Sequence, residues 1–274
     1  MDTSVSGVVV NYRTKELTKS AVESILCEPE VADVVVVDNA SGDGSAELLR
    51  QDLVDPRVKV VASDTNRGFG QGVNLGVANA TETSEFLLFL NSDAVVEPGA
   101  LGPLVQALRS DQQIAIAAPL IVAPSGETQI DSHGVFPSLR TMVFRTNRHP
   151  PDDLQPDWVS GAAMLVRRAA FDQVGGFDPA FHMYLEDVDL CKRLREQAWN
   201  IRRVAESRVR HQSGGSGKTA EQTDMYHRSL VTLMRKQGAP KLEVTLVSAA
   251  HRAWSTARST ITPPRSAKDI VRQS

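Results

Sequence analysis

The carboxylate of Asp93 lies just beyond a short apolar run, and a carboxylate at such a position could take part in chemistry. Asn91-Ser92-Asp93 comes directly after the apolar residues 86–90. A carboxylate just beyond a buried strand is costly without a partner, and a divalent cation held between Asp93 and a diphosphate would provide one. A turn or a helix cap would also account for the motif, so both interpretations stand at this point.

The acidic pair Glu186-Asp187 precedes an apolar helical pattern. Leu190 and Leu194 share one helix face with Asp187, so we expect Asp187 at the helix start, turned toward the interior. A carboxylate placed there can accept a proton from an acceptor hydroxyl. Capping of the helix by Glu186 and Asp187 is the alternative.

A glycine-rich stretch lies between a predicted strand and a predicted helix, and reads Asn66-Arg67-Gly68-Phe69-Gly70-Gln71-Gly72-Val73-Asn74. Three glycines at alternate positions would let the backbone approach a ligand closely, and the helix would point its N-terminus at phosphate or ribose. The spacing differs from that of the dinucleotide fingerprint, and the stretch follows the third strand. A tight turn that needs glycine is the alternative.

One histidine, His211, follows the strand-like residues 200–205 and precedes a glycine-rich stretch at 214–217. This place fits a metal ligand beside a mobile loop. A structural histidine is the alternative.

Runs rich in β-branched residues alternate with helical patterns in the first hundred residues. We predict strands at 5–10, 34–37, 58–62 and 86–90, and helices from Thr14 and near 70–80. Strands that are apolar on both faces indicate a parallel sheet covered by helices. Ligands bind beyond the carboxyl ends of such strands, where the polar residues above fall.

The second half is less regular. We predict loops and short strands at 119–156, a strand at 158–166, a helix at 187–198, and helical structure from about Thr219 with a break at Pro240.

Composition bounds the class of protein. The chain has 274 residues, of which 41% are hydrophobic, so it can bury a sizeable core and disorder is not expected. The net charge of -3 gives no reason to expect nucleic acid as a partner. Residues 218–274 hold ten Lys/Arg and four Asp/Glu, a charge of +6 that leaves -9 elsewhere. Such a tail could meet an anionic membrane face or a phosphate-bearing acceptor, or it could be a solvated helix.

The remaining sequence signals concern location. We expect Cys27 and Cys191 to be buried thiols in a reducing compartment. No apolar run approaches the ~18 residues of a membrane span, and residues 1–7 lack the pattern of a signal peptide. We expect a cytoplasmic protein, peripheral at the inner face of the cell membrane.

Taken together, these segments resemble family 2 glycosyltransferases of the GT-A fold, most of all the rhamnosyltransferase-type branch. The resemblance runs in order from about residue 5 to 215. The segments that carry it are Val8 to Tyr12, Val37 to Gly44, Asn66 to Asn74, Leu90 to Ala94, Ser160 to Met164, Gly175 to Asp178 and Glu186 to Leu190.

The resemblance implies roles for individual residues. Asp187 would be the base, with Glu186 as a helper, and Asp93 and His211 would hold Mg²⁺ or Mn²⁺. The first position of the family's usual two-acid metal motif is Asn91 here. The residues implied for donor binding, with the last two lining the donor-sugar and acceptor pocket, are Asn11, Tyr12, Asp38, Asn39, Asn66, Arg67, Gly68, Phe69, Gly72, Asn91, Ser160 and Gly161.

The resemblance also implies an architecture. We expect an α/β GT-A domain over 1–217, with a mostly parallel, Rossmann-like central sheet flanked by helices. Its nucleotide-binding half would span about 1–95 and its acceptor-binding half about 96–217. Residues 218–274 would form a basic helical C-terminal extension.

The implied reaction is inverting transfer of a sugar from a dTDP- or UDP-linked donor to a glycan or polyprenyl-diphosphate-linked acceptor. L-Rhamnose from dTDP-rhamnose is the favoured donor sugar, and galactofuranose or glucose are the alternatives. A nucleotidyltransferase is disfavoured because residues 10–13 lack a basic glycine-rich signature. A non-catalytic nucleotide- or glycan-binding module is disfavoured because it has no need of a base such as Asp187.

Overall fold

The computed structural model describes residues 4–129, 132–137, 154–212 and 219–249. The chain divides into two compact units, Met1–Gly217 and Lys218–Ser274. Each unit is described by itself.

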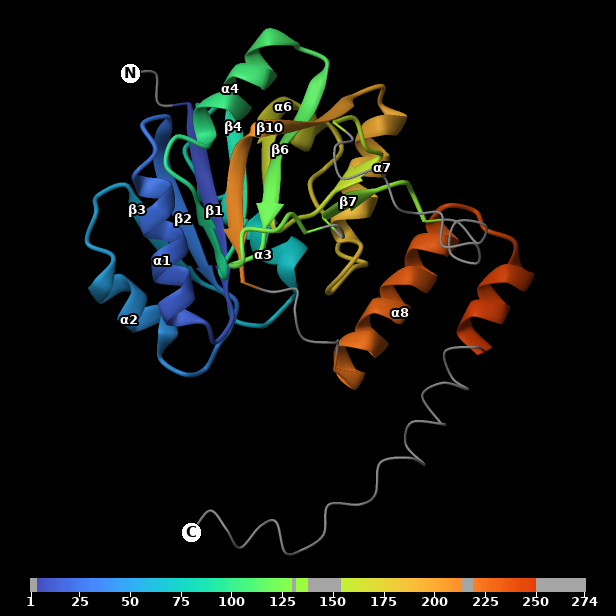
Figure 1. Cartoon of the computed structure of the whole chain (residues 1–274). Coiled ribbons are helices and arrows are strands. Elements are labelled where there is room, and N and C mark those ends of the chain that lie inside the picture. Colours follow the sequence, from blue (N-terminus) through green and yellow to red (C-terminus); the bar gives the residue numbers. More distant parts are fainter. Residues whose placement is uncertain (1–3, 130–131, 138–153, 213–218, 250–274) are drawn as a thin grey trace, which may run out of the picture. The chain divides into compact units, whose positions relative to one another are not determined.

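The first unit is built on an eight-stranded sheet with the order β3-β2-β1-β4-β9-β6-β10-β5 (Figure 1). Its strands are β1 (Val5–Asn11), β2 (Val31–Asp38), β3 (Val58–Ala62), β4 (Phe86–Asn91), β5 (Ala94–Val96), β6 (Ile114–Val122), β9 (Ala163–Arg167) and β10 (Asn200–His211). A separate antiparallel pair joins β7 (His133–Gly134) to β8 (Trp158–Val159).

The strand directions confirm the mostly parallel sheet expected from the sequence. Strands β1 to β4 run parallel to one another, and β6 runs parallel to β10. Strand β9 lies antiparallel between β4 and β6, so β6 and β10 run in the same direction as β4. The carboxyl ends of β1, β2, β4 and β10 therefore meet at one edge of the sheet.

Helices cover both faces of this sheet. They are α1 (Lys15–Leu26), α2 (Ser45–Asp52), α3 (Phe69–Val77), α4 (Leu101–Ser110), α6 (Arg168–Gln173) and α7 (Glu186–Glu196). The predicted strand at 158–166 is wrong as one element, because residues 160–162 break it between β8 and β9. Strand β10 is longer than predicted, so His211 ends it rather than following it.

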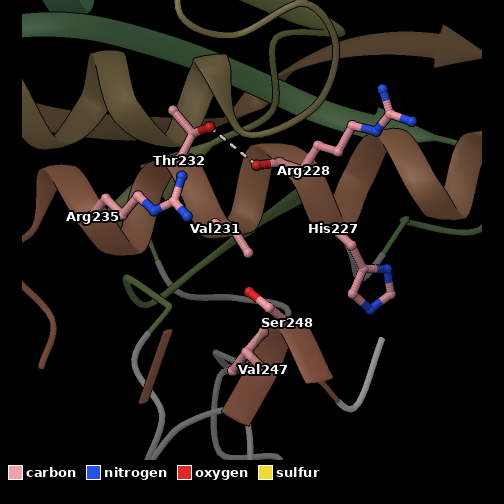
Figure 2. Close-up of a pocket in the computed structure, with 7 residues that line it drawn as sticks. All are labelled: His227, Arg228, Val231, Thr232, Arg235, Val247 and Ser248. Atoms are coloured by element: carbon pink, nitrogen blue, oxygen red, sulfur yellow. Dashed lines mark hydrogen bonds between the residues drawn. The ribbon is translucent and has the colours of Figure 1, made fainter. Parts of the chain in front are cut away.

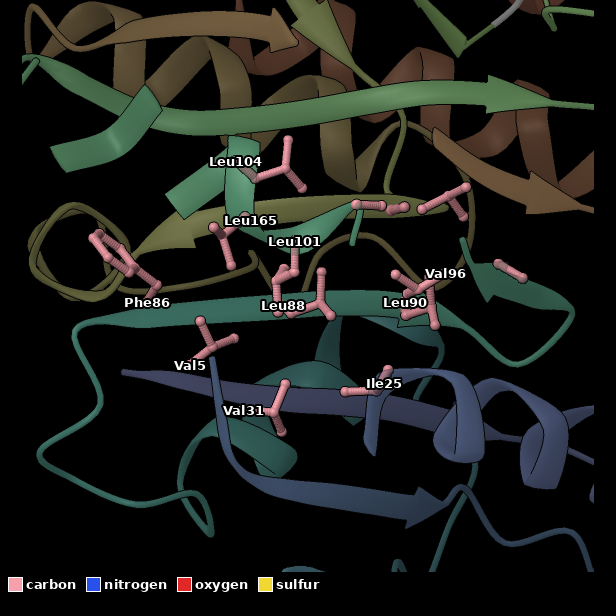
Figure 3. Packing of buried hydrophobic residues seen from close by; sticks show 14 of the residues in the cluster. Val5, Ile25, Val31, Phe86, Leu88, Leu90, Val96, Leu101, Leu104 and Leu165 are labelled. Carbon is pink, nitrogen blue, oxygen red and sulfur yellow. The ribbon is translucent and has the colours of Figure 1, made fainter. Parts of the chain in front are cut away.

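Alternate residues of the buried strands face two different hydrophobic clusters. Val5 and Val9 pack with α1, α2 and α4 on one face, whereas Val8 and Val10 pack with α3, α6 and α7 on the other. Figure 3 shows side chains of the first cluster packed together, from the strands and from the helices that cover this face. A strand buried on both faces must be apolar throughout, which explains the unbroken valine runs.

The two cysteines differ in their surroundings. Cys191 is buried in α7, and burial raises the pKa of its thiol to about 12. Cys27 is exposed, so the expectation that both are buried was wrong for this residue. It is the C-cap of α1, one position beyond the helix, and it falls outside the buried stripe that ends at Ile25.

The second unit begins with α8 (Ala220–Lys236), followed by a helix at 241–249. Thr219 caps α8 through a capping box with Gln222. The break between the two helices spans residues 237–240 and includes Pro240, as predicted from the sequence. Nowhere in the described part of the chain is a helix long and apolar enough to span a bilayer.

A buried carboxylate fixes the start of α4. Glu28 is almost fully buried, and its two oxygens accept hydrogen bonds from the amides of Gly99 (2.8 Å) and Leu101 (2.9 Å). These are amides that the helix itself cannot satisfy, and a negative charge is favourable at a helix N-terminus.

We expect Glu28→Ala to lower the free energy of unfolding by about 2 kcal/mol, because the buried amide of Leu101 and the part-buried amide of Gly99 lose a charged acceptor. Urea denaturation followed by circular dichroism measures the change. Glu23→Ala, an exposed change in α1, is the matched control and should stay within ~0.5 kcal/mol of wild type. Equal stability of the two variants would refute this role of Glu28.

Candidate functional site

Two of the predicted donor-binding side chains, Asn11 and Asp38, bond to each other. The Asn11 Nδ2 atom donates to Asp38 Oδ1 (2.6 Å) and to Ser41 Oγ (3.1 Å). Its Oδ1 atom accepts from the hydroxyl of Thr18 at 2.9 Å. Asn11 is fully buried, so it shapes the loops at the carboxyl ends of β1 and β2.

Asn39 fixes the glycine-rich stretch to the same edge. Its side chain donates to Asn66 Oδ1 (3.0 Å) and to the Gly68 carbonyl (3.1 Å), and it accepts from the Arg67 amide (3.3 Å). The side chains of Tyr12 and Arg67 are exposed, so they remain available to a ligand.

The glycines of this stretch face protein atoms. A Cβ atom on Gly68, whose φ is +87°, would lie 1.7 Å from the carbonyl oxygen of His182. A Cβ on Gly72 would lie 2.8 Å from Val10 Cγ1. Close packing of backbone against protein, which only glycine allows, therefore accounts for these two positions.

A carboxylate and an imidazole meet at the carboxyl ends of β4 and β10. Asp93 Oδ1 lies 3.2 Å from His211 Nε2, and both side chains are largely buried. The other ring nitrogen, Nδ1, lies 3.2 Å from Gln129 Oε1, and Gln129 Nε2 donates to the His211 carbonyl at 3.0 Å. The Asn91 amide nitrogen lies 3.4 Å from His211 Nε2.

This hydrogen-bonding pattern assigns the protons of His211. The Gln129 amide nitrogen already donates to a carbonyl, so Oε1 is the acceptor and Nδ1 carries the hydrogen. The Nε2 lone pair then faces Asp93 Oδ1. Two acceptors at this distance repel each other unless a proton or a metal cation lies between them, and an aspartate oxygen beside an imidazole nitrogen is a ligand pair that divalent metals accept. In the described residues no third His, Cys, Asp or Glu joins this pair.

Asp187 lies in the first turn of α7. Its Oδ2 atom accepts from the Gly161 amide (2.9 Å) and its Oδ1 atom from the Val188 amide (2.8 Å). A Cβ on Gly161 would lie 3.2 Å from the ring of Phe69 and 3.7 Å from Asp187 Oδ2. Three predicted residues, Phe69, Gly161 and Asp187, are therefore in contact.

Short links join these groups along the sheet edge. The backbone amide of Asn91 donates to the Ala162 carbonyl at 2.9 Å. The preceding residue, Gly161, is the one that donates to Asp187. The hydroxyl of Thr14 donates to Ser92 Oγ at 2.9 Å, which ties the Asn11 cluster to the Asp93 pair. Ser160 turns inward, where its Oγ accepts from the Ala162 amide.

Glu186 is placed differently from Asp187. It is buried, its Oε2 atom has no hydrogen-bond partner among the described residues, and burial followed by the charge of Asp187 raises its pKa to about 8. Glu186 is therefore mostly protonated at neutral pH. Tyr184 and Leu185, just before it, both have positive φ, which directs the chain sharply into α7.

The sequence analysis assigned no role to the residues that support this site. Gln129, Thr14 and Ser41 each hold a predicted residue, yet all three have common side chains in loops or at a helix cap. Only the register of β10 against β6 and β5 brings His211 to Gln129 and Asp93.

Comparison with known proteins identifies the family. Residues 6–175, more than half of the chain, match Glycosyl transferase family 2. The chain belongs to glycosyltransferase family 2. Residues 149–213 also match the N-terminal domain of galactosyltransferase.

Two relatives give a finer likeness. An N-acetylglucosaminyl-diphospho-decaprenol L-rhamnosyltransferase of Mycobacterium tuberculosis is 30% identical in an alignment of 215 residues that covers 67% of this chain and 67% of that protein. The rhamnosyltransferase WbbL of Escherichia coli K12 is 27% identical over 68% of this chain and 75% of that protein. The chain is thus a rhamnosyltransferase-like member of the family and a nucleotide-sugar glycosyltransferase.

Solved structures confirm the GT-A fold. A mannosyltransferase of Pyrobaculum calidifontis in complex with GDP-Man and Mn²⁺ superposes with a TM-score of 0.65, at 16% identity over 98% of this chain and 79% of that one. GalNAc-T7 with UDP, GalNAc and Mn²⁺ gives 0.63 at 17% identity, over 85% of this chain and 47% of that one.

The raised pKa of Glu186 predicts a pH-dependent stability. Between its ordinary pKa of 4.5 and about 8, the folded chain holds a proton that the unfolded chain releases. The free energy of unfolding should therefore fall as pH rises through this window, by at most ~1.4 kcal/mol per pH unit. Glu186→Gln should remove this slope.

Urea denaturation from pH 5 to pH 9 measures the slope. Glu196→Gln, an exposed change on the same helix, is the control and should retain it. Identical slopes in wild type and Glu186→Gln would contradict the raised pKa.

Proposed function

We propose that this chain is a metal-dependent, inverting glycosyltransferase that moves L-rhamnose from dTDP-rhamnose to a hydroxyl of a glycan or polyprenyl-diphosphate-linked acceptor. The observation that carries the proposal is the Asp93–His211 acceptor pair, joined through residues 161 and 162 to the carboxylate of Asp187. Metal binding, proton acceptance and sugar transfer need these groups at one edge of one sheet.

The residues at this edge fit a divalent cation. Asp93 would contribute one oxygen and His211 its Nε2 atom, and substrate phosphate and water would complete the shell, as in other sites of few protein ligands. The presence of one imidazole suits Mn²⁺ as well as Mg²⁺. A bound ion would neutralise charge on the departing nucleoside diphosphate.

Asp187 is the proposed base. Two backbone amides hydrogen-bond to its carboxylate and hold it in place. The carboxylate is therefore already positioned before proton transfer. It would accept the proton of the acceptor hydroxyl as that oxygen bonds to the anomeric carbon. The bond from that carbon to the diphosphate oxygen breaks on the opposite side, so the configuration inverts. Glu186, buried and mostly protonated, would support Asp187 rather than replace it.

The remaining predicted residues divide by their exposure. Tyr12 and Arg67 are exposed and would contact the nucleotide directly. The buried residues Asn11, Asp38 and Asn39 would act by holding the loops that surround it. We retain residues 1–95 as the nucleotide-binding half and 96–217 as the acceptor-binding half of one domain.

The second unit would meet the membrane face that carries a lipid-linked acceptor. Its helix at 241–249 exposes Leu242 (69%) and Leu246 (55%), one turn apart. A cavity of about 300 Å³ lies between this helix and α8, lined by Val231 and Val247 and by two arginines of α8. Figure 2 shows these lining side chains. Apolar side chains beside basic ones suit an anionic lipid surface. The protein would act at the cytoplasmic face of that membrane.

Nucleoside diphosphate release from a panel of donors tests the reaction. We expect Mn²⁺- or Mg²⁺-dependent release from dTDP-rhamnose with a prenyl-diphosphate-linked glycan, and less from UDP-galactofuranose or UDP-glucose. Asp187→Asn should lower kcat by a factor of about 10²–10⁴, because the base is lost.

Asp172→Asn, an exposed change in α6, is the control and should keep wild-type activity. Preferred release from another donor would replace rhamnose by that sugar. Nucleotide binding without release from any donor and acceptor would favour the binding-module alternative, and undiminished activity of Asp187→Asn would refute the base.

Vesicle co-sedimentation tests the membrane contact. Vesicles of phosphatidylcholine and phosphatidylglycerol should bind the wild-type chain, and deletion of residues 241–274 should abolish most of that binding. Leu242→Ser with Leu246→Ser should weaken it by about 30-fold or more, since two exposed leucines lose ~1 kcal/mol or more each in apolar transfer. Unchanged partitioning of both variants would refute the contact.

A further inference from the structure

Gln129 makes two reciprocal hydrogen bonds with His211. Its Nε2 atom donates to the His211 carbonyl (3.0 Å), and its Oε1 atom lies 3.2 Å from His211 Nδ1. The two bonds fix the orientation of the amide, because a flipped amide would place its NH₂ group against the ring and its oxygen against the carbonyl. Gln129 therefore selects the tautomer with hydrogen on Nδ1.

The backbone of Gln129 is itself held on both sides. Its amide donates to the Ile121 carbonyl (2.8 Å) at the end of β6, and its carbonyl accepts from the hydroxyl of Ser132 (2.7 Å). The Ser132 carbonyl in turn accepts from the Ser160 amide at 2.8 Å. The residue after Ser160 holds Asp187. The side chain of Gln129 thus extends from a backbone fixed to both the sheet and the loop of the base.

We propose that Gln129 is a positioning residue for the metal centre: it fixes the Nδ1–H tautomer of His211 and thereby leaves Nε2 as the ligand that faces Asp93. This inference rests on the proposed function. Without Gln129 the ring could rotate or carry its hydrogen on Nε2, and either change would remove the ligand. Partners of this kind typically contribute 10–100-fold to metal affinity.

The experiment is a Mn²⁺ titration of the full chain in the presence of dTDP, with free Mn²⁺ followed by electron paramagnetic resonance. We expect Gln129→Ala to weaken Mn²⁺ binding by about 10–100-fold. Gln129→Glu should recover part of the affinity, because one carboxylate oxygen accepts from Nδ1–H while the hydrogen bond to the His211 carbonyl is lost. Gln112→Ala, an exposed change in the same unit, should bind Mn²⁺ like wild type.

A second readout needs no metal. The ¹⁵N chemical shifts of the His211 ring should report the Nδ1–H tautomer in wild type and Gln129→Glu, and a mixture or the Nε2–H tautomer in Gln129→Ala. Wild-type Mn²⁺ affinity together with an unchanged tautomer in Gln129→Ala would overturn the inference while leaving the metal site intact. Failure of the wild-type chain to bind Mn²⁺ with dTDP would instead refute the metal site itself, and the role of Gln129 with it.

Discussion

The close approach of helix α3 to strand β1 is the constraint on which the site depends. A Cβ atom on Gly76 would lie 2.3 Å from Val8 Cγ1, so the helix can lie this near the sheet only without side chains at the contact. The same helix then reaches the segment before α7. Asn74 bonds to both the amide and the carbonyl of Phe177, and the Gly68 backbone lies against His182. The chain that leads into Asp187 is thereby fixed relative to the end of β1.

The common direction of the strands turns this packing into a site. Because β1, β2, β4 and β10 end at one edge, residues that are far apart in sequence meet there without long loops. Backbone groups of Gly161, Ala162 and Ser132 link several of these residues to one another. Side chains that must be free to react are in this way oriented by groups that cannot easily move.

The sequence predicts those parts that depend on local patterns. Valine runs predict β1 to β3, and Asn91 to Asp93 can be placed at the end of the apolar run 86–90. Local patterns do not predict how distant segments pair. Strand register decides that β9 lies beside β4, that β10 extends to His211, and that His211 contacts Gln129. The resemblance to the family suggested a metal role for His211, but it had nothing to say about Gln129. The glycines at 68, 70 and 72 pack against protein atoms, which the sequence could not reveal because it shows the missing side chain but not what fills its place. Their role toward a donor stays a prediction.

Strand β9 also has a consequence for biosynthesis. Strand β4 is apolar and buried on both faces, and one of its edges pairs with residues 163–167, which leave the ribosome only after residues 92–162 have been made. Until then that edge exposes unpaired backbone groups beside leucine and phenylalanine, which is a template for pairing with another chain. The two halves of the first unit therefore cannot mature one after the other. Both halves contribute strands to one sheet, which is complete only after residues 163–167 have paired. A fragment ending near residue 95 would be expected to aggregate rather than to bind nucleotide.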